Sequence, residues 1–134
     1  MPLQASILKQ RDYLIANIQA ALADDDLKRL RDAVVAEVGV HRARGVIVDV
    51  SALDVMDSFA VWTLRELAQM TRLRGAETVV VGIQPEVAFA MAQLGVRLEG
   101  VAAALDLEEG LAYLDRRAKR PAVRGVGPNP GRRA

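Results

Sequence analysis

Short apolar runs alternate along the chain with apolar residues at helical spacing, and this alternation predicts an α/β domain. Two runs, at 46–50 and 78–83, are rich in β-branched residues, which is typical of strands buried on both faces. A helical segment, Ser58–Arg74, lies between them and stops at Gly75. Because two buried strands joined by a helix form a crossover, we expect the two strands to be parallel.

Further elements flank this unit on both sides. The pattern predicts a strand pair at 5–8 and 13–18, a helix near 25–43 that Gly45 ends, a helix between Pro85 and Gly95, a weak strand near 98–104 and a last helix near 107–118. Acidic residues at 24–26 favour a helix start, because they face the partial positive charge of the first turn. Asp106 and Glu109 have the spacing of a capping box.

The 134 residues correspond to one compact domain, which we place at 1–118, followed by a basic tail at 119–134. Seven of the 18 Lys and Arg residues lie from Arg116 onward, so residues 1–115 carry 11 basic side chains and all 17 acidic ones. The tail has no apolar periodicity and is expected to be disordered. The body is therefore acidic although the formal net charge is +1.

Several classes of function find no support in the composition. The chain has no cysteine, which excludes disulfides and thiolate metal sites, and no apolar run near the ~20 residues of a membrane helix. We expect a cytoplasmic protein without a signal peptide. We also expect no nucleic-acid partner, because the tail offers no aromatic residues for base stacking.

Candidates for metal or cofactor chemistry are weak. Asp24, Asp25 and Asp26 are better explained by a helix start than by a metal site, and His41, the only histidine, by a helix end. A Gly-x-Gly sequence occurs only at 125–127, in the tail. We expect no metal, no cofactor and no enzyme activity, since no base and nucleophile are paired along the chain.

The informative segment runs from Asp49 to Ala60, between the first buried strand and the helix that follows it. Ser58 occupies a cap-like position at the start of that helix. Open α/β sheets place functional groups at the carboxyl edge of their strands, where this junction lies. A serine there serves as a capping residue, as a switch, or as both, because phosphate at a helix start meets exposed amides.

An apolar strand, then Asp49-x-Ser51, a short loop and Asp57-Ser58 at a helix start resemble the STAS domain of anti-sigma-factor antagonists. The resemblance covers residues 3–118. It implies a mixed, mostly parallel β-sheet with helices packed largely on one face. It also implies that Ser58 is phosphorylated by a partner serine kinase.

Phe59 refines this resemblance. Simple antagonists commonly continue Asp-Ser-Ser-Gly, whereas a bulky apolar residue after the serine is similar to the RsbS-type scaffold subunit of the stressosome. This similarity implies a switch kinase of the RsbT type and RsbR-type STAS paralogues as partners, in a homo- or hetero-oligomer. A simple soluble antagonist that binds an anti-sigma kinase directly is the alternative.

The helix after Ser58 carries a second apolar face in addition to the one expected on the sheet. Phe59 and Trp62 belong to it, and exposed aromatic residues are typical interface anchors. The alternative is that a neighbouring helix covers this face. We predict a partner-binding site formed by Asp54, Asp57, Phe59 and Trp62.

A phosphoacceptor receiver domain is a remote alternative of the same fold class. Asp49 would serve as its acceptor, but Asp12 is unpaired and the only late lysine, Lys119, lies beyond the last predicted strand. The pattern therefore favours a phosphorylation-switched binding module.

Overall fold

The computed structural model describes residues 4–118 and contains one five-stranded sheet with four helices. The strands are β1 (Ala5–Gln10), β2 (Tyr13–Ile18), β3 (Gly45–Asp49), β4 (Glu77–Val81) and β5 (Ala102–Ala104), and they lie in this order across the sheet. Only β1 and β2 are antiparallel, and the other neighbours pair in parallel. The predicted mixed, mostly parallel α/β fold is confirmed.

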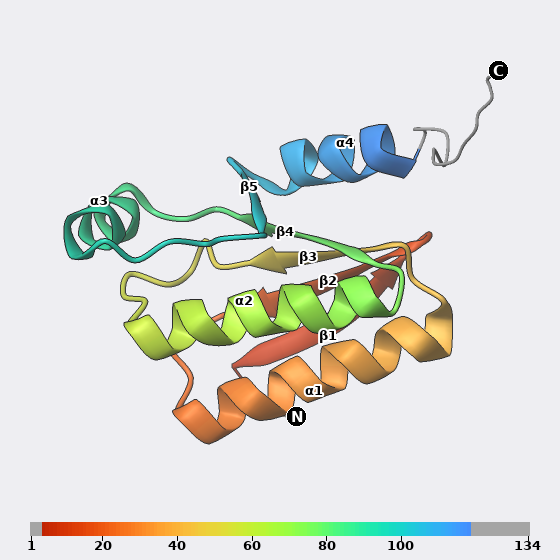
Figure 1. The fold of residues 1–134 in the computed structure, drawn as a ribbon, viewed down its shortest axis with the longest axis horizontal. Helices are drawn as coiled ribbons and strands as arrows, with labels where there is room; N and C mark the ends of the chain where they lie inside the picture. The colour runs from red at the N-terminus through yellow and green to blue at the C-terminus, as the bar shows by residue number, and fades with distance from the viewer. Residues whose placement is uncertain (1–3, 119–134) are drawn as a thin grey trace, which may run out of the picture.

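Two long helices cover one face of the sheet, α1 (Asp24–His41) and α2 (Ser58–Leu73), and lie side by side in Figure 1. α4 (Leu107–Ala118) crosses the opposite face, and α3 (Pro85–Leu94) lies at one end of the molecule. The sheet therefore has a helical layer of two helices on one side and a single helix on the other.

The alternation of side chains along the central strands builds a core on each face. Val46, Val48 and Val80 point into the cluster under α1 and α2, whereas Ile47 and Val79 belong to the cluster under α4. This period of two is the geometry of a pleated strand. Because both faces of β3 and β4 are buried, these strands contain apolar runs without polar alternation, as predicted.

Glycine allows α4 to lie close to the sheet. A Cβ on Gly110 would approach Val81 Cγ1 to 2.7 Å, which is closer than side chains normally pack. Farther along the helix, Tyr13 Oη donates a 2.6 Å hydrogen bond to Asp115 Oδ1. Burial and this hydrogen bond raise the pKa of Tyr13 to about 12. The helix is thus held to β2 and β4 by close packing and by one short polar contact.

Most of the predicted helix ends are confirmed. α1 begins at Asp24, Pro85 is in the first turn of α3, and Gly95 caps α3 in the left-handed conformation. In α4 the Asp106 carboxylate accepts from the Glu109 amide at 2.9 Å. His41 lies in the last turn of α1, where it contacts Glu37.

The prediction that Gly45 ends the first helix is wrong. Arg42 adopts the left-handed conformation (φ 51°) after His41 and ends α1. Gly45 instead begins β3, where a Cβ would lie 2.8 Å from Leu114 Cδ1 of α4. The weak strand near 98–104 is confirmed as the shorter β5, and the predicted tail at 119–134 lies outside the described residues.

Candidate functional site

The loop between β3 and α2 is held at both ends, which fixes the start of α2. Asp49 Oδ1 accepts from the Ser51 amide at 2.9 Å, and Gln84 Nε2 donates to the Ser51 carbonyl at 2.8 Å. Leu53 is buried in the core, and Met56 packs against it. Asp54 lies between these two anchors and is exposed to solvent.

Asp57, and not Ser58, caps α2. Its backbone is extended (φ −82°, ψ 175°), and its Oδ1 accepts from the Ala60 amide at 2.8 Å. Ser58 is the first residue of the helix and is exposed. The expectation that Ser58 occupies the cap is therefore wrong by one residue. The cap is Asp57, and Ser58 is the next residue along the chain.

The exposure of the hydroxyl side chains separates Ser58 from later alternatives. Thr63, Thr71 and Thr78 are buried, and Thr71 and Thr78 share a 2.7 Å hydrogen bond between their hydroxyls. Ser51 and Ser58 are the exposed serines of the described chain. Both lie at the carboxyl edge of the sheet, so Ser51 is a natural control for any reaction at Ser58.

Trp62 and Phe59 lie on the exposed side of the same helix. Their ring centroids are 6.2 Å apart, and Lys28 of α1 places its ammonium 5.7 Å from the Phe59 ring. α1 therefore covers Phe59 in part, which the sequence left open. Trp62 remains 52% exposed. An aromatic side chain that is half exposed in this way is suited to anchoring a partner.

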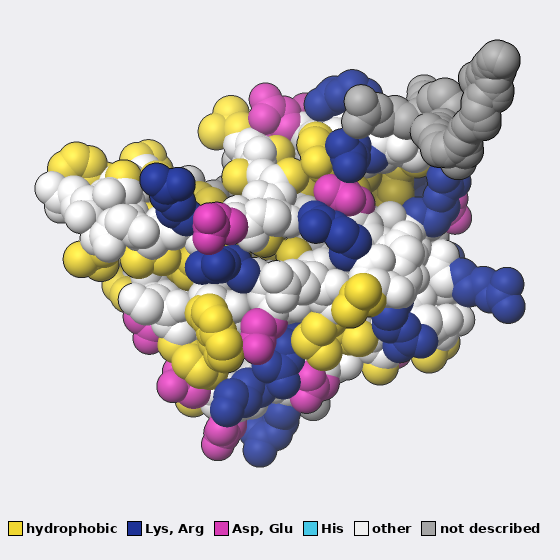
Figure 2. Space-filling model, viewed as in Figure 1, with side chains coloured by type: hydrophobic (Ala, Val, Ile, Leu, Met, Phe, Trp, Pro, Cys, Tyr) yellow, Lys and Arg dark blue, Asp and Glu magenta, His cyan; other side chains and the backbone are white. Residues whose placement is uncertain are grey.

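A hollow of about 550 Å³ begins at Ser58 and separates α2 from the segment that follows α3. Its lining is Ser58, Phe59, Val61, Trp62, Arg65, Gly95, Val96, Arg97 and Glu99. Arg65 donates to Glu99 Oε1 at 3.0 Å, which bridges the two sides. Figure 2 shows basic and acidic side chains close together between α3 and α2, with hydrophobic side chains exposed beside them.

The hollow unites three of the residues singled out from the sequence and adds others. Ser58, Phe59 and Trp62 line it, whereas Asp54 lies in the preceding loop and the Asp57 carboxylate is engaged in capping. Sequence reasoning missed Arg65, Arg97 and Glu99. Arg65 and Glu99 are 34 positions apart, and no local spacing relates Arg65 to the other two residues.

Other kinds of site are not apparent in residues 4–118. This part of the chain contains no cluster of His, Cys, Asp or Glu suited to holding a metal ion. Nor does any helix in it have both the length and the apolar character needed to cross a bilayer. The exposed serine and the adjoining hollow are the features that call for a functional explanation.

Residues 4–107 match the family model described as STAS domain, which is most of the chain. The chain belongs to the STAS domain family. Its fold is similar to that of the S58E variant of RsbS from Moorella thermoacetica, with 31% identity, a TM-score of 0.74 and coverage of 87% of this chain and 99% of that one. The sequence resemblance to RsbS-type STAS proteins is confirmed.

A second solved structure, described as the molecular architecture of the stressosome, is similar at 30% identity, with a TM-score of 0.67 and coverage of 86% of this STAS domain and 100% of that chain. Among curated proteins, RsbRA of Bacillus subtilis, an RsbT co-antagonist protein, is 29% identical over 84 residues. RsbRD of the same organism is 26% identical over 95 residues. The chain spans 31% and 34% of these two relatives.

The anti-sigma-factor antagonist SpoIIAA in its unphosphorylated form shares the fold, with a TM-score of 0.64 at 15% identity. At that identity only the architecture is comparable. The STAS domain described here therefore has the fold common to RsbS-like proteins and to simple anti-sigma-factor antagonists.

Proposed function

We propose that this STAS domain is a phosphorylation-switched docking subunit that holds a switch serine kinase of the RsbT type in a stressosome. The observation that carries the proposal is the exposed Ser58 hydroxyl beside half-exposed Trp62 and a hollow of about 550 Å³. RsbR-type STAS paralogues complete the assembly, and the similarity to the stressosome chain supports their participation. The complex is cytoplasmic in this proposal, as the kinase requires ATP.

The chain supplies only an acceptor in this reaction and is not an enzyme. The Ser58 Oγ attacks the γ-phosphorus of ATP, the bond to the bridging oxygen breaks, and ADP leaves. The hydroxyl proton passes to a base on the kinase, which also supplies the magnesium ions. The role of Ser58 is then to be exposed, and Asp57 makes this possible by capping the helix in its place.

Phosphorylation adds a charge of nearly −2 at a helix start without breaking the fold. The helix N-terminus favours an anion by typically 0.3–1 kcal/mol, whereas each carboxylate at about 6 Å costs about 2–3 kcal/mol at an effective dielectric near 20, and less when exposed. Asp54 and Asp57 are exposed, so solvent screening reduces their repulsion toward the size of the favourable helix effect. A partner pressed against the same edge meets the added charge directly, and a loss of about 3 kcal/mol weakens binding roughly a hundredfold.

The test is phosphorylation by the cognate kinase and ATP, followed by mass spectrometry. We expect one acid-stable phosphate that Ser58→Ala abolishes and Ser51→Ala retains. An acid-labile phosphate on Asp49 would support the receiver alternative instead. If neither residue is modified, the proposal is wrong.

Kinase binding is tested with Ser58→Asp, which places one negative charge at the same site. We expect this variant to bind the kinase at least tenfold more weakly than wild type, because one carboxylate carries about half the charge of phosphate. Equal binding by wild type and Ser58→Asp would refute release by charge.

A simple soluble antagonist that binds an anti-sigma kinase directly is the second candidate, and the shared fold with SpoIIAA supports it. Gel filtration with an RsbR-type paralogue distinguishes the two. A megadalton particle supports the stressosome subunit, and a persistent monomer or dimer supports the antagonist.

A further inference from the structure

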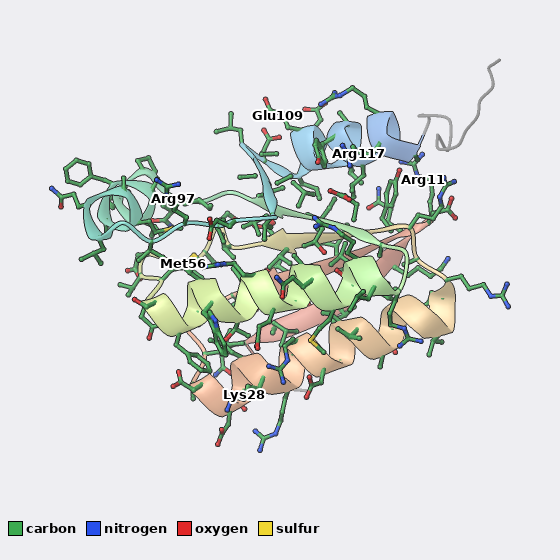
Figure 3. The ribbon with its side chains drawn as sticks, in the orientation of Figure 1. Arg11, Lys28, Met56, Arg97, Glu109 and Arg117 are labelled. Atoms are coloured by element: carbon green, nitrogen blue, oxygen red, sulfur yellow. The ribbon has the colours of Figure 1, made fainter. Side chains whose placement is uncertain are left out.

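The hollow beside Ser58 is lined by two arginines and one glutamate, so it carries a net positive charge next to the exposed serine. Arg65 projects from α2, and Arg97 and Glu99 come from the segment between α3 and β5. Figure 3 labels Arg97 beside α3, on the segment that runs back toward the sheet above the first turns of α2. Ser58 therefore begins a pocket that already contains two guanidinium groups.

The ion pairs across this pocket are incomplete. Arg65 Nη2 and Glu99 Oε1 are 3.0 Å apart, and the Glu99 side chain is 63% exposed. Within the described part of the chain, Arg97 makes neither a hydrogen bond nor a salt bridge of its own. The lining thus holds two guanidinium groups but only one carboxylate, and this excess of positive charge favours an anion.

We propose that phosphoserine at position 58 is bound within the same chain by Arg97 and Arg65, in place of Glu99, so that the segment at 95–100 closes over the hollow. The ligand of this site is a phosphomonoester dianion. The proposal rests on the proposed function, because it requires that Ser58 carries phosphate. Phosphorylation would then close the docking hollow in addition to repelling the kinase by charge.

Helix geometry places Arg65 within range of the phosphate. Ser58, Trp62 and Arg65 are spaced i, i+4 and i+7, which puts them on one stripe of α2. Their Cα atoms at the two ends are about 10.5 Å apart along the axis. Long side chains on a helix lean toward its N-terminus, so the Arg65 guanidinium is directed toward the turn that carries Ser58.

The exchange of ligands is favourable in charge and geometry. The planar fork of a guanidinium binds phosphate through two parallel hydrogen bonds, which are stronger than its contact with an exposed carboxylate. Glu99 returns to water at little cost, because an exposed ion pair contributes little to stability. Two arginines and a dianion then neutralise one another where the hollow opens.

Closure would change the surroundings of Trp62. That side chain lines the hollow next to Ser58 and is the only tryptophan of the chain. When Arg97 is drawn toward the phosphate, its segment moves over the exposed indole. Phosphorylation would then cover the Trp62 indole so that the kinase cannot contact it. The added charge would also repel the kinase.

The experiment uses the full chain with phosphoserine incorporated at position 58 during synthesis, so that no kinase is needed. Phosphorus NMR titration measures the second pKa of the phosphate, which is near 6 for free phosphoserine. We expect the pKa to be lower by about one unit in the wild-type background, because two cations favour the dianion. Arg97→Ala and Arg65→Ala should each abolish a large part of this lowering and bring the phosphate pKa back toward about 6.

Lys28→Ala is the matched control, since it removes a nearby positive charge that does not line the hollow. Acrylamide quenching of Trp62 should fall on phosphorylation in the wild-type and Lys28→Ala chains but not in Arg97→Ala. An unshifted phosphate pKa, or an equal effect of Lys28→Ala and Arg97→Ala, would overturn the proposal. That result would leave kinase-dependent phosphorylation of Ser58 untouched, so the two failures are distinguishable.

Discussion

Replacement of Asp57 separates the structural role of its carboxylate from any role in partner binding. The carboxylate caps α2 through a 2.8 Å hydrogen bond from the Ala60 amide. Loss of a helix cap costs typically about 1 kcal/mol, and loss of an anion facing the helix N-terminus a further 0.3–1 kcal/mol. We therefore expect Asp57→Ala to destabilise the domain by about 1–2 kcal/mol. Asp57→Asn should cost about 0.5 kcal/mol, because asparagine caps as well as aspartate but lacks the charge.

Urea unfolding followed by circular dichroism measures both variants against wild type. An unfolding midpoint shifted at constant slope reports stability alone. A thermal scan should show a decrease in melting temperature of about 3–12 °C for Asp57→Ala, since each kcal/mol lowers it by about 3–6 °C in a domain of this size. If Asp57→Asn is as unstable as Asp57→Ala, the cap described here is not the source of the effect. If both variants keep wild-type stability, the carboxylate does not cap the helix in solution.

Four other substitutions test the docking surface and the attachment of α4. Trp62→Ala should weaken kinase binding at least tenfold in calorimetry with little change in stability, whereas Leu73→Ala, 88% exposed at the far end of α2, should leave binding unchanged. Tyr13→Phe should cost about 1–2 kcal/mol at neutral pH through the lost hydrogen bond to α4. Because the Tyr13 pKa is raised to about 12, its contribution is complete below pH 10 and is lost as the pH rises to 12, so wild type should lose more stability than Tyr13→Phe in that range. Gly110→Leu should destabilise by about 2–3 kcal/mol in urea unfolding, because even its Cβ would lie 2.7 Å from a valine methyl of β4.

The order of elements could be predicted because each has a local signal of its own. β-branched runs indicated β3 and β4, and Pro85, Gly95 and Asp106 indicated helix ends that the structure confirms. Local signals fail where two neighbouring residues suit the same role. Asp57 and Ser58 are both good caps, and the choice depends on how Leu53 and Met56 anchor the preceding loop in the core.

Gly45 shows a second limit of local reasoning. A glycine after a helix usually marks its C-terminus, but here its missing side chain makes space for Leu114, 69 positions later. The hollow beside Ser58 was unpredictable for the same reason. Its two sides, α2 and the segment after α3, meet only through the crossover that places both at one edge of the sheet.

The course of α4 has a practical and a biological consequence. The carbonyl of Ala118, at the end of this helix, accepts from Arg44 just before β3, at the amino edge of the parallel strands. The helix α2, whose first residue is Ser58, begins at the opposite, carboxyl edge. In the proposed assembly, contacts near Ala118 would leave the edge at Ser58 free for the kinase, and a sensor surface attached near Ala118 would do the same.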